Sequence, residues 1–408
     1  MNSGDTAFIL ICAALVLLMT PGLAFFYGGM VRKKNVLGVL MQCFAIMGVM
    51  SLQWVLFGYS LAFSEGSWFI GGLQWMGLNG VGLEPYANFS ETIPHQAFMI
   101  FQAMFAIITP ALIIGAFAER IKFSGFIIFS LLWATFVYDP VCHWVWGPGG
   151  WLGQLGALDF AGGTVVHINA GVAALVMALF LGRRKGYENK PMPPHNLPFT
   201  ALGAGLLWFG WFGFNAGSAL AADGIAVNAF VVTNTAAAAA GLTWAFLEWI
   251  LNGKPTIFGI VTGAVAGLVA ITPAAGFVSA LSSIAIGVLV SVVCFVMVSM
   301  VKPKLGYDDS LDAFGVHGIG GMVGAIATGL FASVAVNAGG ANGLFFGNFE
   351  QLKIQLIAVG ATTLYTLVVT VILYKVVDLM VGMRVSEKDE ALGLDLAEHH
   401  EGAYTVIE

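Results

Sequence analysis

The sequence has 408 residues, of which 59% are hydrophobic and only 9% are charged, and its mean hydropathy is +0.89. A soluble globular domain carries about a quarter charged residues, so this composition excludes that class. The formal net charge is −6 and the basic residues are scattered, which excludes a nucleic-acid-binding surface. The chain is therefore expected to lie in a lipid bilayer.

Apolar stretches between charged, Gly, Pro or Asn clusters predict eleven membrane-spanning helices, because one crossing needs about 20 apolar residues. In chain order these helices cover residues 7–30, 38–63, 97–118, 124–140, 161–182, 198–217, 227–251, 256–273, 279–301, 313–334 and 351–381. The first stretch lacks the basic segment of a secretory signal, so we expect it to be retained as a helix. The sequence thus predicts an all-α integral membrane protein.

Basic residues orient this bundle, because they follow the odd-numbered spans and only Lys353 falls on the other side. They are Arg32, Lys33, Lys34, Arg120, Lys122, Arg183, Arg184, Lys185, Lys190, Lys254, Lys302, Lys304, Lys375, Arg384 and Lys388. The positive-inside rule then predicts an outer N-terminus and a cytoplasmic tail over residues 383–408, in the cell inner (plasma) membrane. The loops 64–96 and 141–160 are expected to face outward.

The spans divide into two sets of five around the basic stretch 183–197. Because five is odd, a repeat relating the halves 7–182 and 198–334 has to be inverted in the membrane, as in many transport proteins. The helix 351–381 completes a membrane domain over residues 1–382.

Two histidines lie inside predicted spans, where ionisable residues are expensive and are functional candidates by default. His167 is in GGTVVHINAG of the fifth span and His317 is in FGVHGIGGMVG of the tenth. These positions are equivalent in the two halves, so an inverted repeat would bring both imidazoles together at the midplane. The alternative is that each histidine only hydrogen-bonds neighbouring helices. A proton-handling pair is favoured over a metal site, because no Asp, Glu or Cys stands one turn away.

Carboxylates precede the same two spans. Asp159, in GALDFAGG, is expected to cap the fifth span by accepting hydrogen bonds from free backbone N–H groups. Asp312, in DDSLDAFGVHG, is expected to cap the tenth span in the same way. Asp308 and Asp309 come earlier in that loop and are expected to be solvated.

The cysteines show no CxxC pair, and only Cys142 falls near a predicted loop. We therefore expect small apolar core residues, and neither a disulfide framework nor a zinc site. The four residues are Cys12, Cys43, Cys142 and Cys294.

Aromatic residues cluster near the outer ends of the third and sixth spans, where FQAMFAIITP and LLWFGWFGFNAGS lie. The residues concerned are Phe101, Gln102 and Phe105 in the former, and Trp208, Trp211, Phe214 and Ser218 in the latter. Trp146 lies on the outer loop that leads to Asp159. A cation that sheds water would gain about 1–2 kcal/mol from each ring face, and a hydroxyl acceptor would favour a cation that donates hydrogen bonds.

Six long stretches occur together in this order: PGLAFFYGGMVRKKNVL, AFAERIKFSGFIIF, ALDFAGGTVVHINAG, WFGFNAGSAL, DDSLDAFGVHGIGGMVG and MRVSEKDEALGLDLAEHHEGAY. With these motifs the sequence resembles the ammonium transporter family (Amt/MEP/Rh), and in particular its prokaryotic Amt members, over essentially the whole chain. The resemblance implies a homotrimer of eleven-helix subunits, each with its own pore, and a transporter without cofactors rather than an enzyme.

The resemblance also implies roles for individual residues. Trp146, Phe105 and Ser218 would form an outer recruitment site for ammonium, or for methylammonium as its analogue, with Asp159 beside it in a structural role. Phe105 and Phe214 would close the outer vestibule, and His167 and His317 would line the hydrophobic pore. The tail would contact neighbouring subunits, and a PII-type (GlnK) protein would dock at the cytoplasmic face.

The expected mechanism is recruitment of ammonium, loss of a proton near the phenylalanines, and passage of ammonia along the histidines. Whether the proton follows by a separate route stays open. An alternative is an ammonium sensor or transceptor that signals through the tail, for which an appended kinase or cyclase would be the discriminating feature. A membrane enzyme is disfavoured, because no nucleophile, base and orienting group cluster in the sequence.

Overall fold

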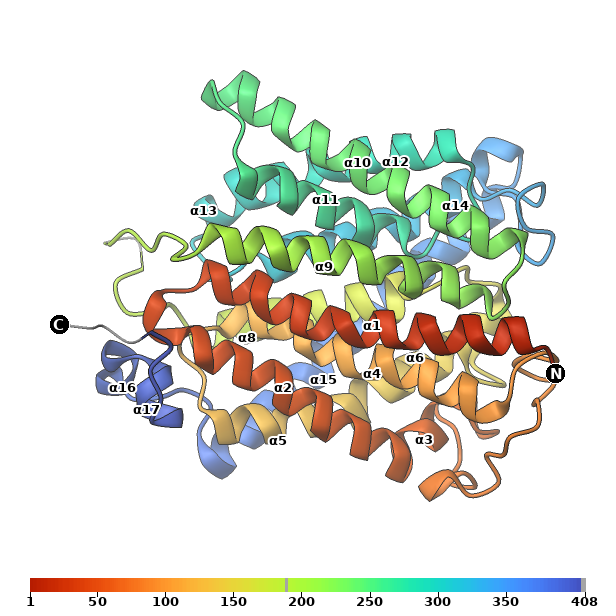
Figure 1. Cartoon of the computed structure of the whole chain (residues 1–408), viewed down its shortest axis with the longest axis horizontal. Coiled ribbons are helices and arrows are strands. Elements are labelled where there is room, and N and C mark those ends of the chain that lie inside the picture. Colours follow the sequence, from red (N-terminus) through yellow and green to blue (C-terminus); the bar gives the residue numbers. More distant parts are fainter. Residues whose placement is uncertain (188–189, 405–408) are drawn as a thin grey trace.

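The computed structural model describes residues 1–187 and 190–404, and its helices run together along the long axis of the molecule (Figure 1). Among these described residues, ten helical segments are long and apolar enough to cross a membrane: Ser3–Met30, Lys33–Phe63, His95–Phe117, Phe123–Leu155, Gly163–Leu181, Leu197–Ala219, Gly224–Asn252, Ala280–Leu305, Phe314–Phe331 and Phe349–Val381. The shorter apolar helix Ile257–Ile271 lies among them. The described residues form no β-strand, so the prediction of an all-α membrane protein is confirmed.

Of the ten long segments in the described residues, four are single α-helices and six are joined from shorter pieces. The α-helices are α1 (Ser3–Met30), α2 (Val36–Gln53), α3 (Tyr59–Phe63), α4 (His95–Phe117), α5 (Phe123–Trp133), α6 (Asp139–Trp146), α7 (Trp151–Leu155), α8 (Asn169–Leu181), α9 (Leu197–Ala216), α10 (Gly224–Asn252), α11 (Ile257–Ile271), α12 (Ala280–Val296), α13 (Lys302–Leu305), α14 (Ile319–Phe331), α15 (Phe349–Val381), α16 (Glu387–Leu392) and α17 (Leu394–His399). Within the described chain, π-helical turns interrupt five spans: η2 (Trp54–Gly58), η4 (Ala134–Tyr138), η5 (Gly163–Ile168), η7 (Met297–Val301) and η8 (Phe314–Gly318).

The fourth span is longer than the sequence indicated. We expected it to end at residue 140, but α5, η4, α6 and α7 continue it to Leu155. Pro140 has no N–H to donate to the carbonyl oxygen of Phe136 one turn earlier, and that oxygen instead accepts a hydrogen bond from the Tyr365 hydroxyl at 2.7 Å. His143 and Trp146 are therefore helical residues rather than parts of an outer loop, and Cys142 is buried within α6 instead of lying near a loop.

The two halves of the chain pack against each other in an antiparallel sense. Helix α1 lies along α9, the first helix of the second half, and the two run in opposite directions (Figure 1). The two broken helices make matching contacts with each other: η5 packs against α14, and η8 packs against α8. This arrangement supports the predicted inverted repeat.

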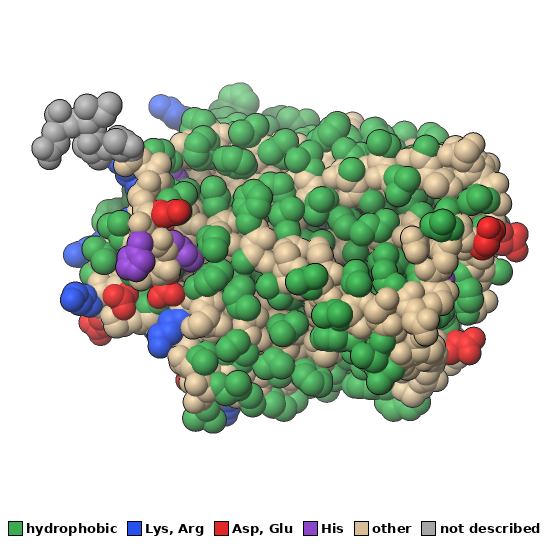
Figure 2. All heavy atoms as spheres, turned by 60° about the horizontal axis from the view of Figure 1, so that its bottom comes forward, with side chains coloured by type: hydrophobic (Ala, Val, Ile, Leu, Met, Phe, Trp, Pro, Cys, Tyr) green, Lys and Arg blue, Asp and Glu red, His purple; other side chains and the backbone are tan. Residues whose placement is uncertain are grey.

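The N-terminus and the end of the described chain lie at opposite ends of the bundle (Figure 1), as an odd number of crossings requires. We call the end with the N-terminus the outer end, following the positive-inside prediction. Between the two ends the face seen in Figure 2 is mostly hydrophobic, with charged side chains gathered at either end. Side chains such as Leu281 (80% exposed) and Leu379 (89% exposed) would be costly in water, so this belt fits lipid.

Candidate functional site

The two intramembrane histidines meet inside the bundle, as the sequence predicted. The ring centroids of His167 and His317 lie 5.4 Å apart, with an interplanar angle of 20°. Both side chains are buried, yet Nδ1 and Nε2 of His167 and Nδ1 of His317 have no hydrogen-bond partner. Nitrogens without partners do not fit the alternative in which each histidine only holds helices together.

Each histidine sits in a π-helical turn whose free N–H groups are bound by an aspartate eight residues earlier. Asp159 accepts hydrogen bonds from the backbone N–H groups of 162–165 at 2.6 to 3.2 Å, and also from the Thr164 hydroxyl. The capping role predicted for Asp159 is thus seen in the structure. In the second half, Asp309 accepts from the N–H groups of Ala313 (3.1 Å) and Phe314 (2.8 Å).

The predicted roles of the carboxylates before the tenth span were wrong. Asp309 provides the cap, whereas Asp312 has a left-handed backbone (φ 60°) and binds Nζ of Lys302 at 2.6 Å. Asp308 and Asp309 are 1% and 0% exposed rather than solvated. Burial raises the pKa of the Asp309 carboxyl above its ordinary value, against the opposing charge of Lys302.

Glycines one turn after each histidine let the two broken helices cross closely. A Cβ atom on Gly171 would overlap the backbone of Gly318, and one on Gly321 would lie 3.0 Å from the carbonyl oxygen of Gly163 and from Cβ of His167. Because both positions lie four residues after a histidine, the crossing holds the two imidazoles side by side.

An outer vestibule of about 320 Å³ contains the residues expected to recruit the solute. Its walls are Phe63, Asn88, Phe89, Phe98, Gln102, Phe105, Val145, Trp146, Phe160, Ser218 and Leu220. The indole N–H of Trp146 donates to the carbonyl oxygen of Asp159 at 2.8 Å, which fixes the ring. The hydroxyl of Ser218 donates to the carbonyl oxygen of Phe214 at 2.9 Å, so its lone pairs remain available.

Two phenylalanines separate this vestibule from the histidines. The ring centroids of Phe105 and Phe214 are 4.3 Å apart with an interplanar angle of 39°, and both residues are buried. Phe214 also lies 6.1 Å from the His167 ring. Below the phenylalanines the passage narrows to a cavity of about 10 Å³ beside both histidines, lined mainly by apolar side chains.

Of the residues along this path, sequence reasoning identified Trp211 and Gln102 without their positions and missed Asn88. Trp211 lies 5.4 Å from the His167 ring, and its indole N–H donates to Thr272, whereas Trp208 faces an apolar groove between α9, α10 and α11. Asn88 and Gln102 add amide groups to the vestibule wall. Asn88 carried no signal, because it comes from an outer loop whose fold hydropathy does not predict.

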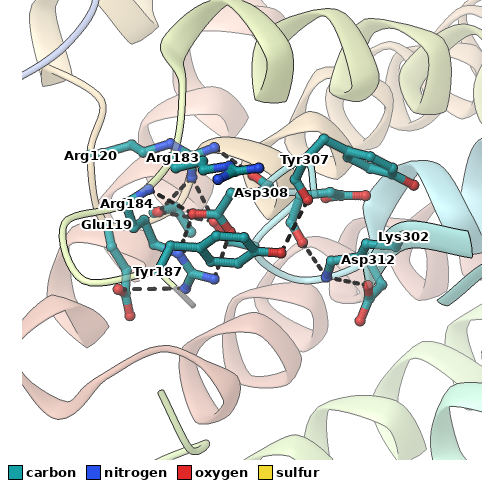
Figure 3. Close-up of polar contacts among 12 residues, drawn as sticks. Glu119, Arg120, Arg183, Arg184, Tyr187, Lys302, Tyr307, Asp308 and Asp312 are labelled. Atoms are coloured by element: carbon teal, nitrogen blue, oxygen red, sulfur yellow. Dashed lines mark hydrogen bonds and ion pairs between the residues drawn. The ribbon is translucent and has the colours of Figure 1, made fainter. Parts of the chain in front are cut away.

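The cytoplasmic end carries a buried cluster of charges (Figure 3). The guanidinium of Arg184 binds Asp308 at 2.8 Å and lies 3.6 Å from Glu119, and Glu119 also binds Arg32 at 2.5 Å. Arg120 donates to the carbonyl oxygen of Asp308 at 2.6 Å. Burial alone would raise the pKa of Asp308, but the hydrogen bonds and charge of Arg184 outweigh it and hold that pKa below its ordinary value. Burial lowers the pKa of Arg120 to about 10.

The tail is docked beside this cluster. Glu390 of α16 accepts hydrogen bonds from the backbone N–H of Lys185 and from Arg384 at 2.8 Å. Asp395 of α17 accepts from the N–H of Gly38 at 2.8 Å, and the N–H of Leu394 donates to Asn35 at the same distance. The tail thus contacts the first half of the chain and the basic stretch that links the two halves.

Among the described residues, no three His, Cys, Asp or Glu side chains gather closely enough to hold a metal ion. The four cysteines are free and buried. The site combines an aromatic vestibule that carries hydroxyl and amide groups, a phenylalanine pair below it, and a narrow apolar passage in which two imidazoles have nitrogens without hydrogen-bond partners.

Comparison with known proteins gives one consistent result. The model of the Ammonium Transporter Family matches residues 7–404. The ammonium transporter of Bacillus subtilis is 57% identical over 404 residues, which cover 99% of each chain. Ammonium transporter Amt1 of Archaeoglobus fulgidus is 51% identical over 407 residues, covering 99% of this chain and all of that one.

Solved structures agree with these sequence relatives. The crystal structure of Candida albicans Mep2 has a TM-score of 0.90 and 38% identity, and the match covers 99% of this chain and 90% of that one. A structure described as a sensor Amt protein has a TM-score of 0.89 and 28% identity, with coverage of 97% and 98%.

Proposed function

Because this chain belongs to the ammonium transporter family, as a multi-pass plasma-membrane protein and not an enzyme, we propose that it recruits ammonium, deprotonates it and conducts ammonia past His167 and His317. The observation that carries this proposal is the pair of buried imidazoles with unpartnered nitrogens in a narrow apolar passage. Ammonia can donate a hydrogen bond to one ring nitrogen and accept one from another, so it suits these groups.

Recruitment rests on the geometry of the vestibule. The rings of Trp146 and Phe105, with centroids 6.0 Å apart and planes at 88°, offer two faces to one cation. The Ser218 oxygen, whose proton is committed to the Phe214 carbonyl, can only accept from a solute. Ammonium donates hydrogen bonds and potassium does not, so this acceptor favours ammonium.

Deprotonation follows from the passage itself. An ion at the bilayer centre costs at least several kcal/mol, and the described wall beside the histidines carries no carboxylate to offset that cost. Potassium has no proton to lose and is therefore excluded. We propose that the proton is released near Phe105 and Phe214, where the vestibule ends. Whether the proton then crosses separately is an outcome of the experiment below.

The assembly and its partners belong to the same proposal. We infer a homotrimer, supported by the apolar groove of about 510 Å³ that α9, α10 and α11 leave open on the side of each subunit.

The docked tail, with Glu390 and Asp395 bound to cytoplasmic loops, offers a surface for a PII-type (GlnK) regulator. The division into a membrane domain (1–382) and a regulatory tail (383–408) accords with α16 and α17 lying beyond the last span.

A sensor or transceptor is the second candidate function. It is favoured by the tail's contacts with the first half and with the linker between the halves, and by the structural likeness to the sensor Amt protein. Under this alternative, removal of residues 383–408 abolishes an ammonium-dependent cellular response while methylammonium flux persists.

The decisive experiment uses purified protein in proteoliposomes, with methylammonium uptake and membrane current measured together. Uptake in wild type, and potassium leakage or lost uptake in His167→Ala and His317→Ala, are the expected results. His400→Asn, in the exposed tail, serves as the control. Unchanged uptake and potassium exclusion in both alanine variants would overturn the histidine role. Current evoked by ammonium indicates a separate proton route, and its absence indicates passive ammonia conduction.

A further inference from the structure

A buried carboxyl group lies inside the fourth span and lines neither the vestibule nor the cavity beside the histidines. Asp139, the first residue of α6, is 0% exposed in the fourth span. Its Oδ2 accepts a hydrogen bond from Nε2 of Gln53, the last residue of α2, at 2.7 Å. Within the described part of the chain, its Oδ1 has no partner and its carboxyl group forms no ion pair. The transport path proposed above does not use this residue.

The backbone on both sides is shaped around this contact. Gln53 directly precedes the π-helical turn η2, and Asp139 directly follows the π-helical turn η4. Residues five apart align in a π-helix, and the Gln53 amide occupies the space where a Cβ atom on Gly58 would stand. Gly58 thus leaves room for the amide, and the two irregular turns direct the two side chains at each other.

Ionisation of Asp139 would be very unfavourable here. A buried carboxylate needs a counter-charge or several hydrogen bonds, and Asp139 has one bond from a neutral amide. The titratable groups around it give no positive charge: Tyr138 stands next to it, Cys142 lies one turn later in α6, and the charge of Asp159, which also acts on Cys142, is negative. The ring nitrogens of His143 are directed at the carbonyl oxygens of Ala62 and Ser67 instead.

The unpartnered atoms match one another once a proton is added. Gln53 is 2% exposed, and its Oε1 is buried without a partner, like Oδ1 of Asp139. A complete acid–amide pair has one N–H···O bond and one O–H···O bond. Without the acid proton, such a pair shows one N–H···O bond and two acceptor oxygens that lack a donor, as Gln53 and Asp139 do here. A proton on Oδ1 supplies the donor that the amide oxygen lacks.

We propose that Asp139 holds a bound proton and forms with Gln53 a neutral acid–amide pair joined by two hydrogen bonds. The pair binds the end of α2 to the start of α6, the helix whose last residue is Trp146 in the vestibule wall. The proton is taken up from water when the protein folds and stays in place, so this is a proton-binding site separate from the transport path.

Infrared spectroscopy of the purified full-length protein in lipid tests this directly. A protonated carboxyl gives a C=O stretching band above the amide band, and this band moves to lower frequency in D2O. We expect the difference between the spectra of wild type and Asp139→Asn, whose amide can replace the acid in the pair, to show such a band at every pH from 6 to 8. The Asp309 carboxyl, whose pKa is also raised, is present in both proteins and cancels in this difference. Asp223→Asn, at the N-cap of α10, is the matched control and leaves the band in place.

A spectrum that is the same in wild type and Asp139→Asn would overturn the proposal, as would loss of the band between pH 6 and pH 8. If Asp139→Asn does not fold, Gln53→Met takes its place. It removes the amide at similar length, so the acid carbonyl loses its donor and the band moves to higher frequency. A band that does not move in Gln53→Met contradicts the pair.

Discussion

The imidazole rings of His167 and His317 lie nearly parallel with centroids 5.4 Å apart, and each stands eight residues after the aspartate that caps its helix. The shared spacing means that Asp159 and Asp309 occupy equivalent places in the two halves. One local design, a capping carboxylate, a π-helical turn and a histidine, is thus used twice, from opposite sides of the membrane.

Gly171→Ala is expected to destabilise the crossing of the two broken helices. The added methyl group would overlap the backbone of Gly318, and overpacking of this kind costs about 1–3 kcal/mol or more. Thermal unfolding in detergent, followed by tryptophan fluorescence, measures the loss. Gly360→Ala in α15 is the control, because its Cβ meets nothing within 4 Å. An unchanged midpoint in Gly171→Ala would contradict the tight crossing.

Asp159→Ala is expected to lower both stability and uptake. It leaves backbone N–H groups of η5 unpaired, at a cost of about 1–3 kcal/mol for each buried group. Asp159→Asn retains one acceptor oxygen and should lose less. Methylammonium uptake, compared with the unfolding midpoint of each variant, checks the order. Equal losses in the two variants would show that the cap depends on charge alone.

Asp308→Asn is expected to remove an acid-dependent part of the stability. The folded pKa of Asp308 lies below its ordinary value of 3.8, so the ionised group stabilises the fold above that pH. The contribution is lost as the pH falls through the folded pKa. Wild type should therefore lose its advantage over Asp308→Asn on acidification. The difference in unfolding midpoint between the two proteins, measured from neutral pH to below pH 4, gives the answer; a constant difference argues against this linkage.

Glu390→Ala is expected to release the tail. Its carboxylate is 1% exposed and binds Arg384, which is 32% exposed, and the partly buried backbone N–H of Lys185, so its loss removes two contacts that hold α16 in place. Limited proteolysis at residues beyond the last span should become several-fold faster. Glu387→Ala is the control, because Glu387 is 86% exposed and pairs with Lys185 only at 3.4 Å. The docking contact has no role if both variants are cleaved at the wild-type rate.

The sequence predicted the histidine pair because an ionisable residue within an apolar span is conspicuous. It could not distinguish Asp309 from Asp312 as the cap, because both stand shortly before the same helix. The left-handed backbone of Asp312, which turns its side chain to Lys302, depends on the tertiary fold. The roles of the buried carboxylates Asp308 and Asp309 depend on partners from distant loops, which no local pattern reveals.

The same limit applies to the helices. The fourth span was drawn too short because Asp139 and His143 interrupt its hydropathy, although both are buried against partners in the second span and the loop after it. Trp208 and Trp211 are one turn apart on α9, and only the rotation of that helix decides that Trp211 contacts His167. Composition and hydropathy predicted the helical architecture. The direction in which an individual side chain points can be known only from the packed structure.

The repeated aspartate, π-turn and histidine arrangement has a consequence for the direction of transport. The centre of the passage looks much the same from either side, so it has no built-in preference for import or export. Any difference between the two directions has to arise at the mouths, where Trp146 and Ser218 stand at one end and the Lys302–Asp312 pair at the other. On the proposed path the centre is a reversible conduit, and the electrochemical gradients of the species that cross determine which way the solute moves.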